Sequence, residues 1–132
     1  MRYVLDADVL IGALDANDAH HKQSRQLLTG WHAQQDTLLI SLPNLSEVLV
    51  APATDEARLR AARAAITALG VGSHQPNEAI AVDAARIRGR HPISLPDAYL
   101  LATATHIGAR VASYDAKVLR AAKVERIAAA AT

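Results

Sequence analysis

The sequence of 132 residues contains no cysteine and no phenylalanine, and it has only one tryptophan. The absence of cysteine excludes disulfides, a thiolate nucleophile and a cysteine-based zinc site. Because aromatic residues are so few, alanine and leucine must fill most of the core, and both favour helices. A hydrophobic fraction of 51% is sufficient for such a core.

The chain also lacks an excess of charge of either sign, since 14 Lys and Arg face 13 Asp and Glu and give a net charge of +1. It therefore has no strong overall field to attract nucleic acid. Arginines cluster at 58–63 and 86–90; solvated helix faces are the simpler interpretation, and an RNA-binding rim is left open. No apolar run is long enough to cross a bilayer, so we expect a cytoplasmic protein without a membrane segment.

Short apolar segments alternate with helical patterns along the whole chain. Strands are expected at 3–5, 38–41, 111–113 and 124–127, and helices at 9–14, after Asp18, and at 45–50, 55–69, 77–90, 96–107 and 116–122. Gly70 and Gly72 are interpreted as a helix end. The alternation predicts a single α/β domain over residues 1–132, with a mostly parallel central sheet and a frayed tail at 128–132.

Carboxylates follow the predicted strands at their carboxyl ends. Asp6 and Asp8 come after the first strand, Glu47 lies in the helix after the second, and Asp115 follows the strand that ends at Ser113. Asp97 lies just inside the helix that leads into that strand. Because open parallel sheets bind ligands at the carboxyl ends of their strands, we expect these side chains to converge.

Each carboxylate also has a purely structural explanation, because an acidic residue in the first turn of a helix caps free N–H groups. Taken singly, Asp8, Asp97 and Asp115 fit that explanation, whereas Asp6 ends a buried strand. Converging carboxylates repel one another unless a cation neutralises them, and an all-oxygen ligand set suits Mg²⁺ or Mn²⁺. Such an ion activates water and stabilises the leaving oxygen, which predicts metal-dependent hydrolysis of a phosphodiester.

Four segments carry a resemblance to a known family: residues 4–11 (VLDADVLI), 42–49 (LPNLSEVL), 95–104 (LPDAYLLATA) and 109–115 (ARVASYD). Their order and spacing resemble the PIN-domain family, and in particular the VapC-type toxins of bacterial toxin–antitoxin pairs. The resemblance implies a three-layer α/β/α sandwich. It also implies that Asp6, Glu47, Asp97 and Asp115 form the catalytic, metal-binding quartet, with Asp8 and Ser113 as auxiliary residues.

The same resemblance implies an activity and partners that the composition does not reveal. The protein is expected to be a Mg²⁺-dependent endoribonuclease toxin that hydrolyses RNA with a metal-activated water, with Mn²⁺ able to substitute. A homodimer is implied, and so is a cognate VapB-like antitoxin that places a peptide segment, often with an arginine, in the acidic site.

Two alternatives remain open at this point. A phosphatase of the haloacid-dehalogenase type would use Asp6 as nucleophile and Asp8 as acid/base. It would leave Glu47 without a role, and the later acidic pair of that family is missing here. The second alternative is a PIN-like module that binds RNA or protein without cleaving anything, and the intact set of acids argues against it.

Overall fold

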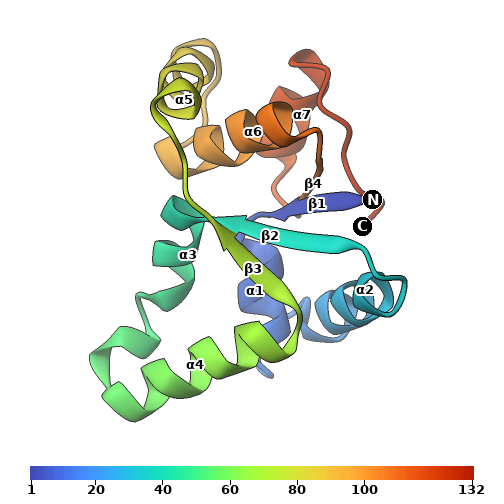
Figure 1. The fold of residues 1–132 in the computed structure, drawn as a ribbon, viewed down its shortest axis with the longest axis vertical. Coiled ribbons are helices and arrows are strands. Elements are labelled where there is room, and N and C mark those ends of the chain that lie inside the picture. The colour runs from blue at the N-terminus through green and yellow to red at the C-terminus, as the bar shows by residue number, and fades with distance from the viewer.

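The computed structural model describes residues 1–132, and its helices cover both faces of a four-stranded sheet (Figure 1). The elements follow in chain order as β1 (Arg2–Leu5), α1 (Ala7–Leu14), α2 (His21–Ala33), β2 (Thr37–Ser41), α3 (Leu42–Leu49), the short 3₁₀ helix η1 (Pro52–Thr54), α4 (Glu56–Ala68), β3 (Val71–His74), α5 (Glu78–Arg90), α6 (Leu95–Ile107), β4 (Arg110–Ala112) and α7 (Ala116–Val124). The strand order is β3-β2-β1-β4, and every pair is parallel. The predicted α/β fold with a parallel sheet is therefore confirmed.

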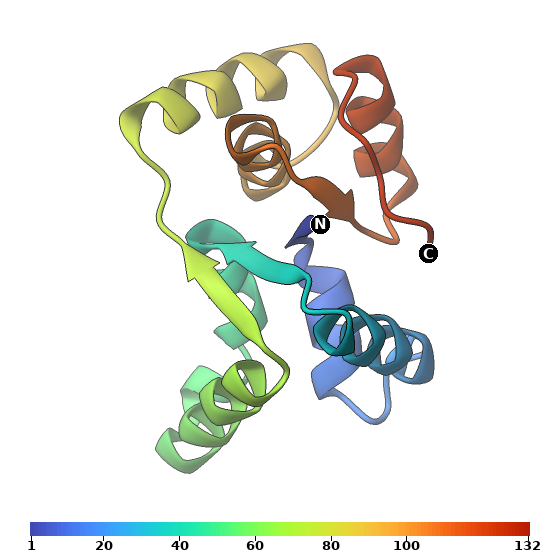
Figure 2. The same ribbon diagram turned by 45° about the vertical axis from the view of Figure 1, so that its right-hand side comes forward.

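The molecule has three layers, as Figures 1 and 2 show. Helices α5, α6 and α7 lie on one face of the sheet, and α1 to α4 lie on the other. A hydrophobic core lies on each face of the sheet, and β1 contributes to both, because successive residues of a strand point to opposite faces. Val4 joins the core beneath α5 to α7, whereas Tyr3 and Leu5 join the core beneath α1 to α4.

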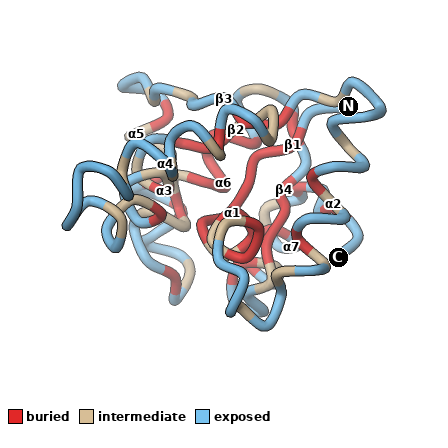
Figure 3. The backbone as a smooth tube through the Cα atoms, turned by 90° about the horizontal axis from the view of Figure 1, so that it is seen from below, coloured by how far each residue is buried: buried red, intermediate tan, exposed pale blue.

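Strand β1 lies at the centre of the sheet, paired with β2 on one side and β4 on the other. Val4 and Leu5 are completely buried, and each stabilises the fold by about 1.5 to 3 kcal/mol. Figure 3 shows β1 and much of α1 as the buried centre of the molecule. The backbone N–H of Asp6 still donates to the carbonyl of Ala112 (2.8 Å), so Asp6 is fixed at the carboxyl edge of this rigid strand.

Strand β3 was not predicted, because Val71 is its only strong β-forming residue. Gly70 does end α4, with φ of +80°, as the sequence indicated, but Gly72 lies within β3 and the helix-end interpretation is wrong for it. The chain then pairs in parallel with β2, from Leu38 opposite Val71 to Ser41 opposite His74. Pairing with β2 thus overrides the low β propensity of the glycine, serine and histidine in this edge strand.

Two expectations for the C-terminal segment are wrong. Residues 124–127 form no strand, because α7 continues to Val124 and a turn follows it. Residues 128–130 are not frayed: the amide of Val111 donates to the carbonyl of Ala128 (2.9 Å), and the amide of Ala130 donates to the carbonyl of Val111 (2.8 Å). This segment forms a parallel bridge beside β4 and extends the sheet at that edge.

No helix combines the length and the apolar character that crossing a bilayer requires.

Candidate active site

The candidate site lies at the carboxyl edge of the sheet, where the predicted acids are carried by four different elements. Asp6 and Asp8 lie at the β1–α1 junction, and Glu47 lies on α3. Asp97 lies in the first turn of α6, and Asp115 lies between β4 and α7. We call the buried and half-buried acids Asp6, Asp8 and Asp97 the floor of the site, and the exposed acids Glu47 and Asp115 its rim.

Asp6 is the most deeply buried of these acids, with 5% of its surface exposed. It occupies the N-cap position of α1, but its side chain makes no capping hydrogen bond. Instead, the buried hydroxyl of Ser113 donates to Oδ2 of Asp6 (2.7 Å) and accepts from the amide of Asp115 (3.0 Å). A helix cap therefore does not explain Asp6, whereas the contact with Ser113 fixes the direction of its carboxylate.

Asp8 projects from the first turn of α1 toward the loop after β4. The amide of Tyr114 donates to Oδ2 of Asp8 (3.0 Å), a contact that joins residues 106 positions apart. The other oxygen, Oδ1, is buried and has no hydrogen-bond partner. A buried acceptor without a partner is unfavourable in itself, and Oδ1 of Asp8 is the one carboxylate oxygen of the five acids that is both buried and unpaired.

Asp97 is not the residue that caps α6, although it lies in the first turn. Ser94 occupies the N-cap, and its hydroxyl accepts from the amide of Asp97 (3.3 Å). Pro96 follows in the first helical turn, where the missing N–H of proline costs nothing. Because Ser94 caps the helix, the acidic side chain of Asp97 is not required for that purpose.

The rim is different, because one of its two acids does act as a cap. Asp115 is the N-cap of α7, and its Oδ1 accepts from the amide of Lys117 (2.8 Å). The helix-capping role considered for Asp115 from the sequence is thus correct for one of its two oxygens, Oδ1. Glu47 makes no hydrogen bond with another side chain and projects from α3 as an exposed residue.

Burial and mutual repulsion raise the pKa values of Asp6, Asp8, Glu47 and Asp97. The pKa of Asp6 rises from 3.8 to about 7, chiefly because burial removes water, with the charge of Asp8 adding to the effect and the Ser113 hydroxyl opposing it. Burial also raises the pKa values of Asp8 and Asp97. The pKa of Glu47 is raised by partial desolvation and by the charges of Asp97 and Asp8.

These charge effects show that the five acids converge as expected. Asp8 and Asp97 each interact electrostatically with all of the other acids: Asp6, Glu47, Asp115 and one another. Asp8 thus lies as centrally as Asp97, although the sequence suggested only an auxiliary position for it. Its place in the first turn of α1 made capping the simpler interpretation, and only the long-range contact with Tyr114 distinguishes it.

The donor set fits a hard divalent cation. All of its side-chain donors are carboxylate oxygens, the floor carries repelling charges, and Oδ1 of Asp8 lacks a partner. No three His, Asp or Glu side chains lie in an arrangement that could hold a metal ion together. Mg²⁺ does not require three, because it keeps several waters and is commonly held by one or two carboxylates.

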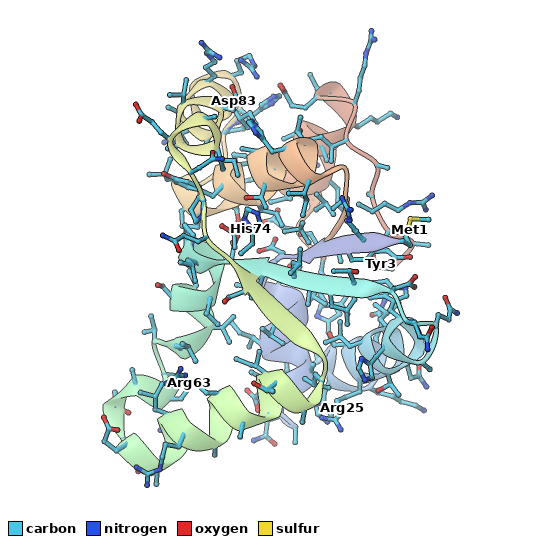
Figure 4. The ribbon with its side chains drawn as sticks, in the orientation of Figure 1. Met1, Tyr3, Arg25, Arg63, His74 and Asp83 are labelled. Atoms are coloured by element: carbon cyan, nitrogen blue, oxygen red, sulfur yellow. The ribbon has the colours of Figure 1, made fainter.

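The two arginine clusters differ in their surroundings. In the cluster on α5, Arg86 pairs with Asp83 (3.1 Å), and Arg90 forms a two-point contact with Glu125 (2.7 and 3.2 Å). In the cluster on α4, none of the arginines makes an ion pair, and all are exposed. Arg63, labelled in Figure 4, lines a cleft between α3, α4 and β3, and Arg58 lines a second cleft together with Glu47.

That second cleft has a volume of about 570 Å³ and runs between α1, α3 and α4. Most of its wall is apolar, with Ile11, Leu14 and Val48 among the lining residues. Glu47 also lines it, so the cleft reaches one of the two rim residues of the acidic site. The surface next to the acids is thus mostly apolar where this cleft runs, and Arg58, which makes no ion pair, borders it.

Comparison with known proteins gives a consistent result for family and fold. A family model described as the PIN domain matches residues 3–124. No curated protein sequence matches the chain.

Three solved structures illustrate the fold. They are VapC20 of Mycobacterium tuberculosis, described as a toxin that cleaves the sarcin–ricin loop (19% identity, 90% of this chain and 94% of that chain, TM-score 0.71), a toxin–antitoxin complex from Klebsiella pneumoniae (24%, 89% and 89%, 0.70), and VapBC-1 from nontypeable Haemophilus influenzae (18%, 98% and 97%, 0.71). At these identities the likeness establishes the fold.

Proposed function

Since the chain belongs to the PIN-domain family, we propose that it is a Mg²⁺-dependent endoribonuclease toxin that a cognate antitoxin neutralises. The observation that carries this proposal is the acidic floor at the carboxyl edge of the sheet. There, Asp6 is buried without acting as a cap, and its pKa of about 7 reflects burial and neighbouring negative charge. Burying carboxylates close together lowers the stability of the fold. We therefore interpret the arrangement as serving a function that requires a cation.

The roles of the residues follow from their surroundings. Asp6, Asp8 and Asp97 would hold the cation, with Glu47 and Asp115 completing the acidic environment from the rim. Ser113 positions Asp6 through its hydroxyl and fixes the loop that carries Asp115. A bound Mg²⁺ would lower the pKa of water and stabilise negative charge on the leaving oxygen, which is the chemistry that phosphodiester hydrolysis needs.

The antitoxin is expected to use the apolar cleft between α1, α3 and α4. A peptide lying along Ile11, Leu14 and Val48 would reach Glu47 and then the floor. An arginine of that peptide would find several carboxylates in reach, and bidentate arginine–carboxylate contacts are strong. The acidic site that repels RNA phosphate in the absence of a cation therefore attracts an inhibitory cationic side chain.

The homodimer that the family resemblance implies is also part of the proposal. The exposed side chains of Leu42 (37%) and Leu95 (50%) line one cleft together with Tyr99. A second copy that covers this apolar surface would remove it from water. Light scattering of the purified protein measures this directly, and a monomer at micromolar concentration would contradict the dimer.

The test of the activity is cleavage of a labelled pool of single-stranded RNA by the purified chain with and without Mg²⁺. We expect cleavage that EDTA abolishes, that Mn²⁺ restores, and that Asp6→Asn removes. Glu78→Gln is the matched control, because Glu78 is an exposed carboxylate whose charge affects none of the site pKa values.

The alternatives give different results in the same assay. Cleavage that persists without metal would contradict the proposed chemistry. Binding of RNA without cleavage at any metal concentration would support the non-catalytic module instead. The haloacid-dehalogenase alternative is not favoured, because the family model and the fold both agree with a PIN domain, and hydrolysis of a small phosphomonoester would be needed to revive it.

A further inference from the structure

Two aromatic rings stack on each other beside the acidic floor. His20 precedes α2, and Tyr114 lies between Ser113 and Asp115; their ring centroids are 4.0 Å apart, and the planes differ by 12°. The backbone of Tyr114 contacts Asp8 directly, through the N–H···Oδ2 hydrogen bond of 3.0 Å. The stacked pair is therefore attached to the same loop that positions the carboxylates.

Several contacts hold both rings in place. The hydroxyl of Tyr114 forms a hydrogen bond with the hydroxyl of Ser24 (2.7 Å), which is completely buried in α2. Gly12 of α1 makes room for Ser24, since a Cβ at position 12 would lie 2.6 Å from the Ser24 hydroxyl. Asp18, which precedes α2, accepts from the amide of His20 (2.8 Å) and fixes the turn before the helix.

One face of the His20 ring is covered by Tyr114, while the side chain remains 48% exposed. About half of the His20 side chain thus stays accessible to solvent, while the stack on Tyr114 restricts the orientation of its flat ring. Flat aromatic faces beside a nucleic-acid site bind unpaired bases by stacking, and every base presents such a face.

We propose that His20 and Tyr114 form a stacking platform for one nucleobase of single-stranded RNA, next to the phosphodiester that is cleaved. The platform rests on the proposed ribonuclease function, and it assigns to these two residues the positioning of the substrate. Stacking would orient the strand so that its backbone crosses the acidic floor, and it would restrict cleavage to unpaired RNA.

Other ligands fit the platform less well. An anion is disfavoured, because a carboxylate oxygen of Asp18 lies 3.8 Å from Nδ1 of His20 and the carboxylate of Asp8 contacts the backbone of Tyr114. A transition metal held by His20 and His21 is disfavoured as well, because Nδ1 of His21 contacts the carbonyl of Gly12 (2.9 Å) and the two rings have separate partners. A neutral, planar ligand remains, and a base is the planar part of RNA.

The experiment uses a short single-stranded RNA that spans a cleavage site mapped with the wild type. Each nucleotide near that site is replaced in turn by an abasic nucleotide, and KM and kcat are measured separately. Stacking of one base is worth about 1 to 3 kcal/mol, so His20→Ala is expected to raise KM roughly 5- to 150-fold with a smaller change in kcat. At one position the wild type should lose affinity for the abasic RNA, and His20→Ala should not distinguish abasic from intact RNA there.

Further variants separate stacking from a purely structural role. His20→Phe keeps an aromatic face and should restore both the low KM and the response to the abasic position. Tyr114→Phe keeps the ring but loses the bond to Ser24, and its effect should be smaller than that of Tyr114→Ala. His32→Ala is the control: His32 lies near the other end of α2, about 18 Å from its start along the helix axis, and its loss should leave KM unchanged.

The proposal would be overturned if His20→Ala retained the wild-type KM and the wild-type response to the abasic position. Failure of His20→Phe to restore them would equally exclude stacking as the reason. If the wild type cleaved no RNA at all, the proposed function would fail, and the platform would fail with it. Cleavage by the wild type that is indifferent to His20 would remove only the platform.

Discussion

The floor and the rim of the acidic site differ in what surrounds their carboxylates. Asp6 on the floor is 5% exposed, makes no capping contact and has a pKa raised to about 7. Asp115 on the rim is exposed and caps α7 through the amide of Lys117. Both aspartates follow a strand at the same edge of the sheet, Asp6 directly after β1 and Asp115 three residues after the end of β4, and yet their physical states differ. Position near a strand end therefore identifies candidate residues, whereas burial and hydrogen bonding decide what each one does.

The largest expected effect of this difference is on catalysis. Asp6→Asn should reduce RNA cleavage at least about a thousandfold, because it removes a buried charge that holds the cation, and several kcal/mol of transition-state stabilisation depend on that cation. Asp115→Asn should reduce cleavage much less, since Asp115 is exposed and partly engaged as a cap. Single-turnover rates with saturating Mg²⁺ measure both. Equal losses in the two variants would break the distinction between floor and rim.

The second prediction concerns pH and the stability of the metal-free protein. Because the pKa of Asp6 is about 7 in the fold and ordinarily 3.8, the fold binds this proton more tightly than the unfolded chain does. Stability should therefore fall as pH rises from about 4 to about 7 and change little above that, with a total loss of at most roughly 4 kcal/mol from this group. Urea unfolding at a series of pH values in EDTA measures the slope. In Asp6→Asn the slope over this window should be much reduced, and an unchanged slope would show that Asp6 is not its source.

Much of the fold was predictable because local signals and tertiary structure agree. The apolar runs at β1, β2 and β4 and the starts of α4 and α5 near residues 55 and 77 lie where the sequence indicated. Strand β3 and the bridge at Ala129 were not predictable, since their backbone conformations depend on pairing with distant strands rather than on their own residues.

The candidate site divides in the same way. Convergence of the acids followed from the parallel sheet, because its carboxyl ends meet at one edge. The central place of Asp8 and the stack of His20 on Tyr114 were not predictable, because each contact joins segments more than 90 residues apart. The sequence shows which residues are acidic, but it does not show which of their carboxylate oxygens lack a hydrogen-bond partner.

The third prediction uses Mg²⁺ itself to separate the two regions. A cation that binds only the folded protein stabilises it by about 2.7 kcal/mol at one hundred times Kd, which appears as a higher melting temperature. We expect Mg²⁺ to raise the melting temperature of the wild type and of Asp115→Asn, but not of Asp6→Asn. Thermal melts in EDTA and in millimolar MgCl₂ provide the comparison. An equal rise in Asp6→Asn would place the binding site outside the floor.

The smallest expected effect concerns the rim as a structural element. Asp115→Ala removes the oxygen that accepts from Lys117 and should lower the free energy of unfolding by about 1 kcal/mol, the usual value for losing an N-cap. Asp115→Asn keeps an oxygen that caps equally well and should leave stability nearly unchanged. At the floor the corresponding substitution, Asp6→Asn, should raise the stability of the metal-free protein near neutral pH, because it removes repulsion and desolvation of charge without removing a cap. Urea unfolding of the three variants in EDTA decides the matter, and a marked destabilisation by Asp6→Asn would mean that the buried carboxylate supports the fold after all.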